Sequence, residues 1–497
     1  MNTLLSGMKQ YASYKTTENG AIAVNTTSSA LYDMFALGGA YRSRSDEDCI
    51  LLFKQAYDEN PVYALKCLFY LRDARGGQGE RRFFRVCMKW LAQAHPEAAK
   101  RNIQHIAEFG RWDDLYQFVG TKLEVEAMNL MKTQLALDVQ CKTPSLLAKW
   151  LKSENTSSAD SRALATKTRK FFGMTPRQYR KTLSILRERI KVLERLMSAG
   201  RWDEIEFDKI PSKAGLVYRN AFARRDMIKA KYEAFAKDEN TKVNAKTLYP
   251  YEVVKQAIAC PDRSTLSDTN RLMVNKYWAN LADYFNGATL NALAVVDTSG
   301  SMTWDGNGSV QPIDVAISLG LYCAEKAKGP FAGHYVSFSS RPQLIETKGV
   351  DFVDKVKRIY RTNLCENTNH EATFDMLLAT ARANRCSQAD LPEHLIVVSD
   401  MEIDSGTYDY RSRWNRVPVE TTMETIRHKW ENAGYTMPKL VYWNVAARNN
   451  TFLMKPDDTV SYISGFSPVL FDQLMSGKTS IDLMYDKLNS ERYEAIC

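Results

Sequence analysis

Residues 288–301 read Ala-Thr-Leu-Asn-Ala-Leu-Ala-Val-Val-Asp-Thr-Ser-Gly-Ser, an apolar run that ends in an acidic, hydroxyl-rich turn. The run up to Val296 predicts a buried strand. From there to the C-terminus, strand patterns alternate with helical patterns. Helices are expected at 313–327, 351–360, 373–383 and 419–432, and strands at 334–338, 343–346, 394–399, 439–445 and 459–463. This order predicts an α/β fold with a doubly wound, mostly parallel sheet, whose ligands bind beyond the carboxyl ends of its strands.

Polar side chains follow two of these expected strands. Asp297, Ser299 and Ser301 stand on the turn after the first strand, with the spacing Asp-x-Ser-x-Ser. A carboxylate and two hydroxyls offer oxygen ligands, which suit Mg²⁺ better than zinc. Asp400 ends a second strand, and Thr368 lies in a polar loop that opens a helix. We therefore expect these five residues to form one site for Mg²⁺ or another divalent cation.

An enzymatic alternative starts from the same aspartate. An Asp after the first strand of a parallel sheet also begins phosphatases of the haloacid dehalogenase class. Those enzymes need Asp-x-Asp-x-Thr, whose second Asp is the acid and base, and here Ser299 takes that position. The chain also contains no HExxH motif and no nucleophile elbow. We predict no catalytic residue and a protein that is not an enzyme.

Charge is divided unevenly along the chain. Residues 291–497 contain 21 Lys and Arg against 26 Asp and Glu, which leaves 46 against 32 for residues 1–290. Within the basic part, residues 141–235 alone contain 22 against 10. This concentration favours a polyanionic partner that carries phosphates. The alternative is that the basic residues only form solvated helix faces.

The basic part has a helical pattern from about residue 30 to residue 240, and its clearest helix is expected at 177–199. Thr175 can cap this helix, Pro176 suits its first position and Gly200 can end it. Its apolar stripe consists of Tyr179, Leu183, Leu186, Ile190, Leu193 and Met197. Its candidates for phosphate contacts are Arg177, Arg180, Lys181, Arg187, Lys191 and Arg195.

A short pattern occurs twice in this part of the chain. Residues 110–114 read Gly-Arg-Trp-Asp-Asp, and residues 200–204 read Gly-Arg-Trp-Asp-Glu. Each copy follows a helical stretch, so both indicate helix-to-helix turns. The echo gives weak support to stacked helical repeats of the HEAT type. Coincidence of a common turn is the alternative.

Residues 72–82 read Arg-Asp-Ala-Arg-Gly-Gly-Gln-Gly-Glu-Arg-Arg. Glycines give a flexible turn, and arginines can bind phosphates through two parallel hydrogen bonds. The candidates are Arg72, Arg75, Arg81 and Arg82. The segment is not a Walker loop, because no Gly-Lys-[Ser/Thr] follows. The alternative is a tight turn between helices in which Asp and Arg residues pair with each other.

Two family resemblances follow from these motifs. Asp297, Ser299, Ser301, Thr368 and Asp400 resemble the metal-ion-dependent adhesion site (MIDAS) of a von Willebrand factor A domain, occupied or empty. Three segments, 72–81, 146–155 and 209–214, resemble the helical TROVE module of Ro-type proteins, closest to its poorly characterised relatives that add an A domain. The resemblance implies HEAT-like repeats that bind small structured or misfolded RNAs, as in a Ro ribonucleoprotein, and makes Lys149 a further RNA-binding candidate.

Length and composition complete the prediction. The chain has 497 residues, which suggests about three domains. We expect an N-terminal extension at 1–30, a basic helical-repeat domain at 31–285 and an A-like domain at 286–497. Nine cysteines without a CxxC pair indicate reduced thiols. With no secretory signal and no membrane-spanning run, we expect a cytoplasmic protein.

The predicted function is RNA binding by the helical repeats, with Mg²⁺ and an acidic protein ligand at the A-like domain. The competing hypothesis is a metal-dependent protein-interaction adaptor that has no nucleic-acid ligand.

Overall fold

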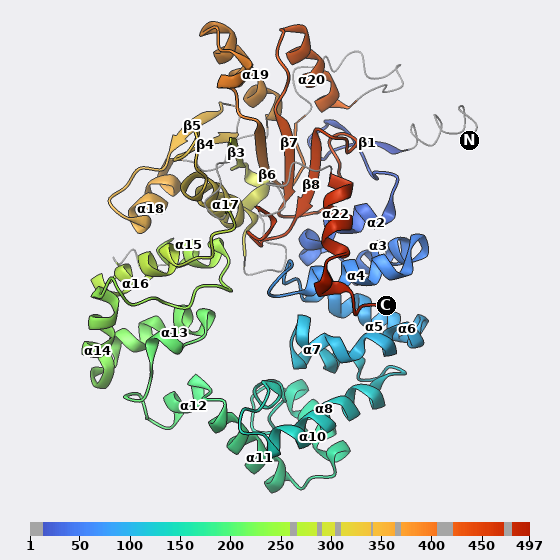
Figure 1. Cartoon of the computed structure of the whole chain (residues 1–497), viewed down its shortest axis with the longest axis vertical. Helices are drawn as coiled ribbons and strands as arrows, with labels where there is room; N and C mark the ends of the chain where they lie inside the picture. The colour runs from blue at the N-terminus through green and yellow to red at the C-terminus, as the bar shows by residue number, and fades with distance from the viewer. Residues whose placement is uncertain are drawn as a thin grey trace. The chain divides into compact units, whose positions relative to one another are not determined.

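The computed structural model describes residues 13–258, 266–285, 291–303, 310–338, 341–362, 369–404, 421–471 and 480–497. The chain forms two compact units (Figure 1). The sheet unit contains Met1–Cys67 and Leu248–Glu491, and the helical unit contains Leu68–Thr247 and Arg492–Cys497. The units follow packing, whereas the boundaries predicted at 30 and 285 follow the change of pattern along the sequence.

The sheet unit is built on six strands in the order β5-β4-β3-β6-β7-β8. Their bounds are β3 Ala292–Asp297, β4 His334–Phe338, β5 Gln343–Glu346, β6 His394–Ser399, β7 Lys439–Asn444 and β8 Val460–Ser464. All neighbouring pairs are parallel except β4 with β5. Every residue of β3 is buried, as expected for a parallel strand covered on both faces. The predicted doubly wound, mostly parallel sheet is therefore confirmed.

Helices from both ends of the chain belong to this unit (Figure 1). Those near the sheet in sequence are α17 Pro312–Lys326, α18 Phe352–Thr362, α19 His370–Ala383, α20 Thr422–Asn432 and α22 Ser480–Leu488. The others are α2 Ala30–Leu37, α3 Asp46–Glu59, α15 Pro250–Ile258 and α16 Asp268–Ala279, with α4 Pro61–Arg72 crossing the unit boundary. Four of these helices, α17 to α20, confirm the four predicted from the sequence.

A short hairpin precedes these helices and was missed in the sequence, which suggested only an extension at 1–30. Its strands are β1 Tyr14–Thr16 and β2 Ile22–Val24, which pair antiparallel. Single β-bridges join Gly20 to Asp404 and Val24 to Phe452. The hairpin is thus part of the sheet unit, held by residues about 400 positions away.

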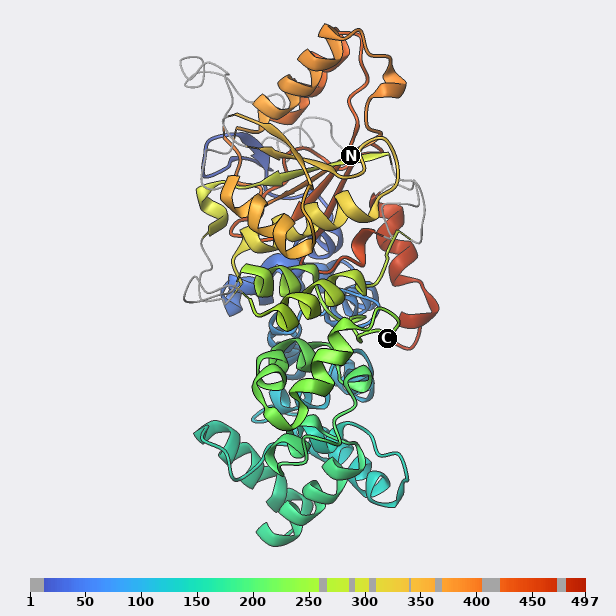
Figure 2. The same cartoon turned by 90° about the vertical axis from the view of Figure 1, so that its left-hand side faces the viewer.

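The helical unit contains no strand among its described residues, so the helical prediction is confirmed (Figure 2). Its α-helices are α5 Arg82–Ala94, α6 Pro96–Asn102, α7 Ile106–Phe109, α8 Glu124–Gln140, α9 Leu147–Trp150, α10 Ala159–Phe172, α11 Pro176–Arg189, α12 Leu193–Ser198, α13 Ser212–Arg224 and α14 Asp226–Lys237. The short 3-10 helices η2 Ile103–His105, η3 Trp112–Phe118 and η4 Phe207–Lys209 lie between them.

The single helix predicted at 177–199 is wrong, because it is broken into α11 and α12. Thr175 caps α11 in a capping box, as expected. The helix ends where Lys191 takes a left-handed conformation, with φ +49°. The amide of Val192 then bonds back to the carbonyl of Arg187 at 3.1 Å, which closes the last turn. Gly200 ends α12 with φ +73°, as predicted.

Close packing of α17 on β3 requires a glycine. A Cβ atom on Gly320 would overlap the Cγ2 methyl of Val296. Both residues lie in the buried interior, where neighbouring atoms yield little. The approach of the helix to the sheet therefore depends on the missing side chain.

We expect Gly320→Ala to lower stability by about 1–3 kcal/mol, because overpacking outweighs the better helix propensity of alanine. Val296→Ala in the same chain should recover part of that loss, since it removes the overlapping methyl. Thermal unfolding of both single variants and of the double variant measures the coupling. A more stable Gly320→Ala protein would contradict the packing argument.

Candidate functional site

The predicted metal ligands meet at the carboxyl edge of the sheet. Asp297 ends β3 and Asp400 directly follows β6, and the two strands are parallel neighbours with Val296 opposite Val398. They lie at the point where successive connections leave in opposite directions, the usual ligand site of such sheets. The topology therefore brings together two carboxylates that are about 100 positions apart.

Hydroxyl groups link the two carboxylates. Ser399 donates to Asp297 Oδ2 at 2.6 Å, and the Ser301 side chain hydrogen-bonds to Asp400. The hydroxyls of Ser299 and Ser301 lie 3.0 Å apart. The structure thus assembles Asp297, Ser299, Ser301 and Asp400, whereas Thr368 lies outside the described residues.

Burial of the two carboxylates, Asp297 and Asp400, in their charged form costs free energy unless a counter-charge lies nearby. Asp297 is 0% exposed and Asp400 is 1% exposed. Burial, followed by the charge of Asp400, raises the pKa of Asp297 to about 7. Burial also raises the pKa of Asp400, against the lowering effect of Arg448. Two adjacent buried carboxylates are an environment that favours cation binding.

The oxygen atoms at this edge fit Mg²⁺. Adjacent ligands of an octahedral ion at roughly 2.1 Å lie about 3 Å apart, which is the separation of the Ser299 and Ser301 hydroxyls. No group of three or more His, Cys, Asp or Glu side chains that could hold a metal occurs within the described ranges. Binding here would therefore depend on hydroxyl oxygens and water beside the two carboxylates.

Sequence reasoning missed two charged residues at this edge, Arg448 and Glu402. Arg448 lies in the loop after β7, and its Nη2 pairs with Asp400 Oδ2 at 2.8 Å. Glu402 is fully buried two residues after Asp400. The rule that points to Asp400, a charged residue beyond the carboxyl end of a strand, also applies to the loop after β7 and could have indicated Arg448.

A second charged site lies in the helical unit. Four arginines, Arg72, Arg81, Arg85 and Arg111, surround two buried aspartates, Asp113 and Asp114, and we call these six residues the arginine cluster. Asp114 accepts from Arg72 Nη2 at 2.7 Å and from Arg85 Nε at 2.6 Å. Arg111 holds Asp113 with two bonds of 2.8 Å. The side chains come from α4, α5 and η3 and from the residues directly before α5 and η3, which are Arg81 and Arg111.

Arg81 carries the surplus charge of this cluster. Arg81 is exposed, and its side chain forms no hydrogen bond or ion pair within the described part of the chain. Burial of part of the side chain lowers its pKa, and the charges of Arg111, Arg85 and Arg72 lower it further. Four guanidinium groups thus face two carboxylates, which is a local environment for an anion.

An aromatic ring adjoins the same cluster. The Arg111 guanidinium lies 3.8 Å from the centroid of the Trp150 ring, and Lys149 Nζ lies 5.6 Å from it. Two of the motif segments singled out in the sequence, 72–82 and 146–155, therefore meet at Arg111. Arg81 and Lys149 are the predicted residues whose charges have no ion-pair partner there among the described residues.

The remaining residues of the 72–82 segment fit the alternative of a tight turn. Arg72 is only 3% exposed and is committed to Asp114. Arg75 donates to the carbonyl of Glu108 at 2.8 Å. A Cβ atom on Gly77 would overlap the backbone carbonyl of Tyr70, so this glycine lets the turn pack closely against α4. Arg82, at the start of α5, is half-buried.

The six predicted basic residues between 177 and 195 are divided between internal bonds and solvent. Arg187 donates to the carbonyls of Ala148 and Leu151 at 2.8 and 2.9 Å. Arg195 pairs with Glu188 at 3.1 Å. The four others are exposed, and within the described residues no ion pair of their side chains occurs: Arg177, Arg180, Lys181 and Lys191.

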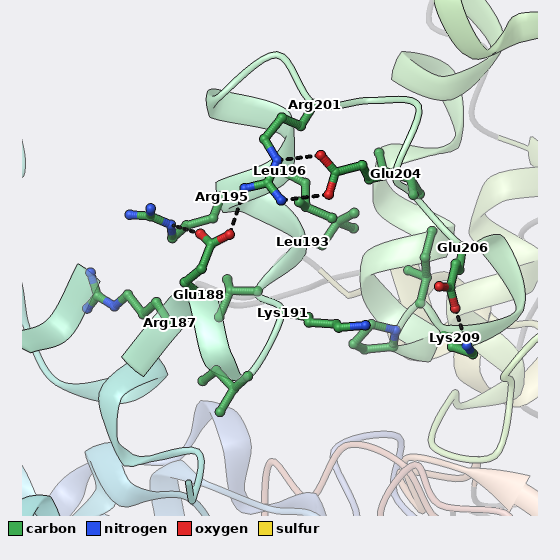
Figure 3. A pocket seen from close by; sticks show the side chains of 15 residues that line it. Arg187, Glu188, Lys191, Leu193, Arg195, Leu196, Arg201, Glu204, Glu206 and Lys209 are labelled. Carbon is green, nitrogen blue, oxygen red and sulfur yellow. Dashed lines mark hydrogen bonds and ion pairs between the residues drawn. The ribbon is translucent and has the colours of Figure 1, made fainter. Parts of the chain in front are cut away.

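Arg187, Lys191 and Arg195 also line a cavity of about 590 Å³ (Figure 3). Its upper wall is a chain of ion pairs, in which Arg201 contacts Glu188 at 2.6 Å and Glu204 at 2.5 Å. Most of its positive charge is therefore balanced by carboxylates on the same wall. This balance makes the cavity a weaker phosphate site than the arginine cluster.

Comparison with known proteins identifies the family. A family model described as a domain of unknown function (DUF2828) matches residues 17–146 and 137–287. The chain belongs to the DUF2828 family. A second model, a domain of unknown function (DUF7788), matches residues 291–495. An uncharacterised protein of Acanthamoeba polyphaga mimivirus is 31% identical over 505 residues, which cover 93% of this chain and 84% of that protein.

The solved structures to which the chain is similar include the crystal structure of the Deinococcus radiodurans RO (RSR) protein. It is 14% identical with a TM-score of 0.48, over 94% of this chain and all of that one. Searched over its described residues, the chain has no helix that is both long and apolar enough to cross a membrane.

The arginine cluster predicts a stability effect. Asp114→Asn should cost about 3–5 kcal/mol, because it leaves the buried Arg72 charge without its partner. Glu204→Gln changes the matching residue of the second Gly-Arg-Trp motif, where the pair with Arg201 is exposed, and should change the melting temperature little. Thermal melts followed by circular dichroism compare the two. Equal shifts would show that Asp114 is not a structural counter-charge.

Proposed function

We propose that this chain is a non-enzymatic RNA-binding protein whose helical unit takes RNA phosphates at the arginine cluster. The observation that carries the proposal is Arg81, an exposed residue whose partly buried guanidinium has no ion-pair partner in the described residues, beside three other arginines that share two carboxylates. The surplus of basic residues in 141–235 supports it, because it extends the positive field along the unit.

The chemistry of the cluster suits single-stranded or looped RNA. A guanidinium forms two parallel hydrogen bonds with a phosphate, and those bonds are stronger than neutral ones. Trp150 is half-buried and already carries Arg111 against its ring. Stacking of bases on aromatic or guanidinium planes is the usual way in which unpaired RNA bases are bound. A small structured RNA or the end of a misfolded RNA would supply both groups.

We further propose that the sheet edge is a MIDAS-type Mg²⁺ site of an A-like domain. Asp297, Asp400, Ser299 and Ser301 would hold the ion, which when bound supplies a Lewis-acidic point for an acidic protein ligand. Asp297 and Asp400 provide the charge, and the serine hydroxyls orient the carboxylates through the bonds already present. A cytoplasmic location remains part of this proposal.

The second candidate function is a metal-dependent adaptor without RNA. It is favoured by the ion pairs of Arg195 and Arg201, which balance part of the positive charge that lines the α11–α12 cavity. The two functions differ in one measurable property. RNA binding through phosphates depends steeply on salt, whereas an adaptor with a solvated basic face shows no such binding.

For RNA binding we expect Arg81→Gln with Lys149→Gln to reduce the slope of log K against log salt by about 1.4. Each lost phosphate contact on a single strand accounts for about 0.7. The probe is a fluorescein-labelled single-stranded RNA, and fluorescence anisotropy of the full chain gives the affinity. Lys132→Gln, which removes an exposed charge of α8, is the matched control and should leave the slope unchanged. No binding by the unaltered chain would favour the adaptor.

For the metal site we expect Asp297→Ala to abolish Mg²⁺ binding and to leave the affinity for the same RNA unchanged, because the two ligands are assigned to different units. Calorimetry with Mg²⁺ and anisotropy with RNA are measured on one preparation. A melting curve checks that the variant is folded. Loss of both affinities in a folded variant would show that the functions are divided wrongly.

A further inference from the structure

We infer that Arg448 is a built-in cation that competes with a divalent ion for Asp400, and that Glu18 is the alternative partner that draws it away. The inference rests on the proposed metal site and adds a regulation of that site. Glu18 lies in the turn of the β1–β2 hairpin, far from Asp400 in sequence. All three residues belong to the sheet unit.

Arg448 bridges two carboxylates of different exposure. Its Nη2 lies 2.8 Å from Asp400 Oδ2, and its Nη1 lies 2.8 Å from Glu18 Oε2. The Asp400 side chain is fully buried, whereas the Glu18 side chain is 45% exposed. The Nε of Arg448 is buried and has no hydrogen-bond partner among the described residues. The guanidinium is therefore held mainly at its two ends, one inside the site and one outside it.

The backbone around this bridge is fixed by other contacts. Glu402 accepts from the amide of Glu18 at 2.8 Å and from the hydroxyl of Thr451 at 3.1 Å. The carbonyl of Arg448 accepts from Arg44 Nη1 at 2.7 Å. The hairpin and the loop after β7 are thus both anchored at the sheet edge. A change of partner by Arg448 needs only side-chain movement.

There is room for that movement on the Glu18 side. Glu18, Ser43, Arg44 and Arg448 line a cavity of about 430 Å³. Arg44 is bound to Asp48 at 3.0 Å, so its charge is balanced within its own segment. The side chain of Arg448 can therefore withdraw from Asp400 toward Glu18 without entering a packed region.

The charges of Arg448 and Glu18 predict in which direction each residue changes the metal affinity. A guanidinium and a divalent ion on one buried carboxylate repel each other, and burial keeps water from screening that repulsion. Removing the Arg448 charge should therefore raise metal affinity. Removing the Glu18 charge leaves the guanidinium with Asp400 alone and should lower metal affinity. By reciprocity, a partner that binds Glu18 weakens metal binding.

The test is Mg²⁺ calorimetry on the full chain and four variants. We expect Arg448→Gln to bind Mg²⁺ about tenfold more tightly and Glu18→Gln to bind it several-fold more weakly, in the range usual for coupled sites. The matched control is Arg427→Gln, which breaks the ion pair with Asp457 in the same unit and should change nothing. Arg448→Lys keeps the charge and should stay near the unaltered affinity.

The outcomes separate this inference from the metal site itself. If the unaltered chain binds no Mg²⁺, the metal site and the competition both fail. If it binds Mg²⁺ and Arg448→Gln weakens binding, Arg448 is a support for Asp400 and the competition is wrong. Equal affinities of Arg448→Gln, Glu18→Gln and the unaltered chain also overturn it. If Arg448→Gln does not fold, the Glu18→Gln variant alone decides. An unchanged Mg²⁺ affinity of Glu18→Gln would then contradict the inference.

Discussion

Two buried carboxylates side by side, Asp297 and Asp400, set the constraint on which the sheet unit depends. Parallel pairing of β3 with β6 puts the ends of both strands at one edge, so their charges cannot be separated without breaking the sheet. Hydrogen-bond donors from the surrounding chain stabilise these two carboxylates. Serine hydroxyls, backbone amides and one arginine all point at these two groups, and the N-terminal hairpin contributes through Glu18.

The helical unit also surrounds buried carboxylates with hydrogen-bond donors, but there the excess charge is positive. Asp113 and Asp114 are buried, and arginines from several helices converge on them. Here the cations outnumber the carboxylates, so the surplus is positive and reaches the surface at Arg81. Buried charge is balanced in both units only in part. The imbalance has opposite signs, which is why a cation suits one site and a phosphate the other.

Sequence patterns predicted what depends on neighbours along the chain. Strand ends place Asp297 and Asp400, and the capping box of Thr175 is read from residues three positions apart. Ion pairs between side chains far apart in the sequence were not predicted. Arg72 and Asp114 are 42 positions apart, and Glu18 and Arg448 are 430 apart, so no local period marks them.

The errors in secondary structure have similarly local causes. The break after α11 depends on one left-handed residue, Lys191, within an otherwise continuous apolar stripe. The stripe stays intact for Leu186 and Leu193, which are both buried, so periodicity alone gives no warning. The strands of the hairpin have three residues each, too few for a period of two to be recognised.

The repeated Gly-Arg-Trp motif shows why a pattern does not by itself make a site. At Gly110 a Cβ atom would overlap the Asp114 carboxylate, so the glycine allows a buried ion pair to form against the backbone. At Gly200 the space is open, and the glycine serves only a left-handed helix end. Both arginines contact an acid within their own motif, but only Arg111 also meets a ring and a cluster of further arginines. The same four letters, Gly-Arg-Trp-Asp, followed by an acid thus give a solvated turn in one place and the centre of a charged site in the other, and burial of the acid decides which.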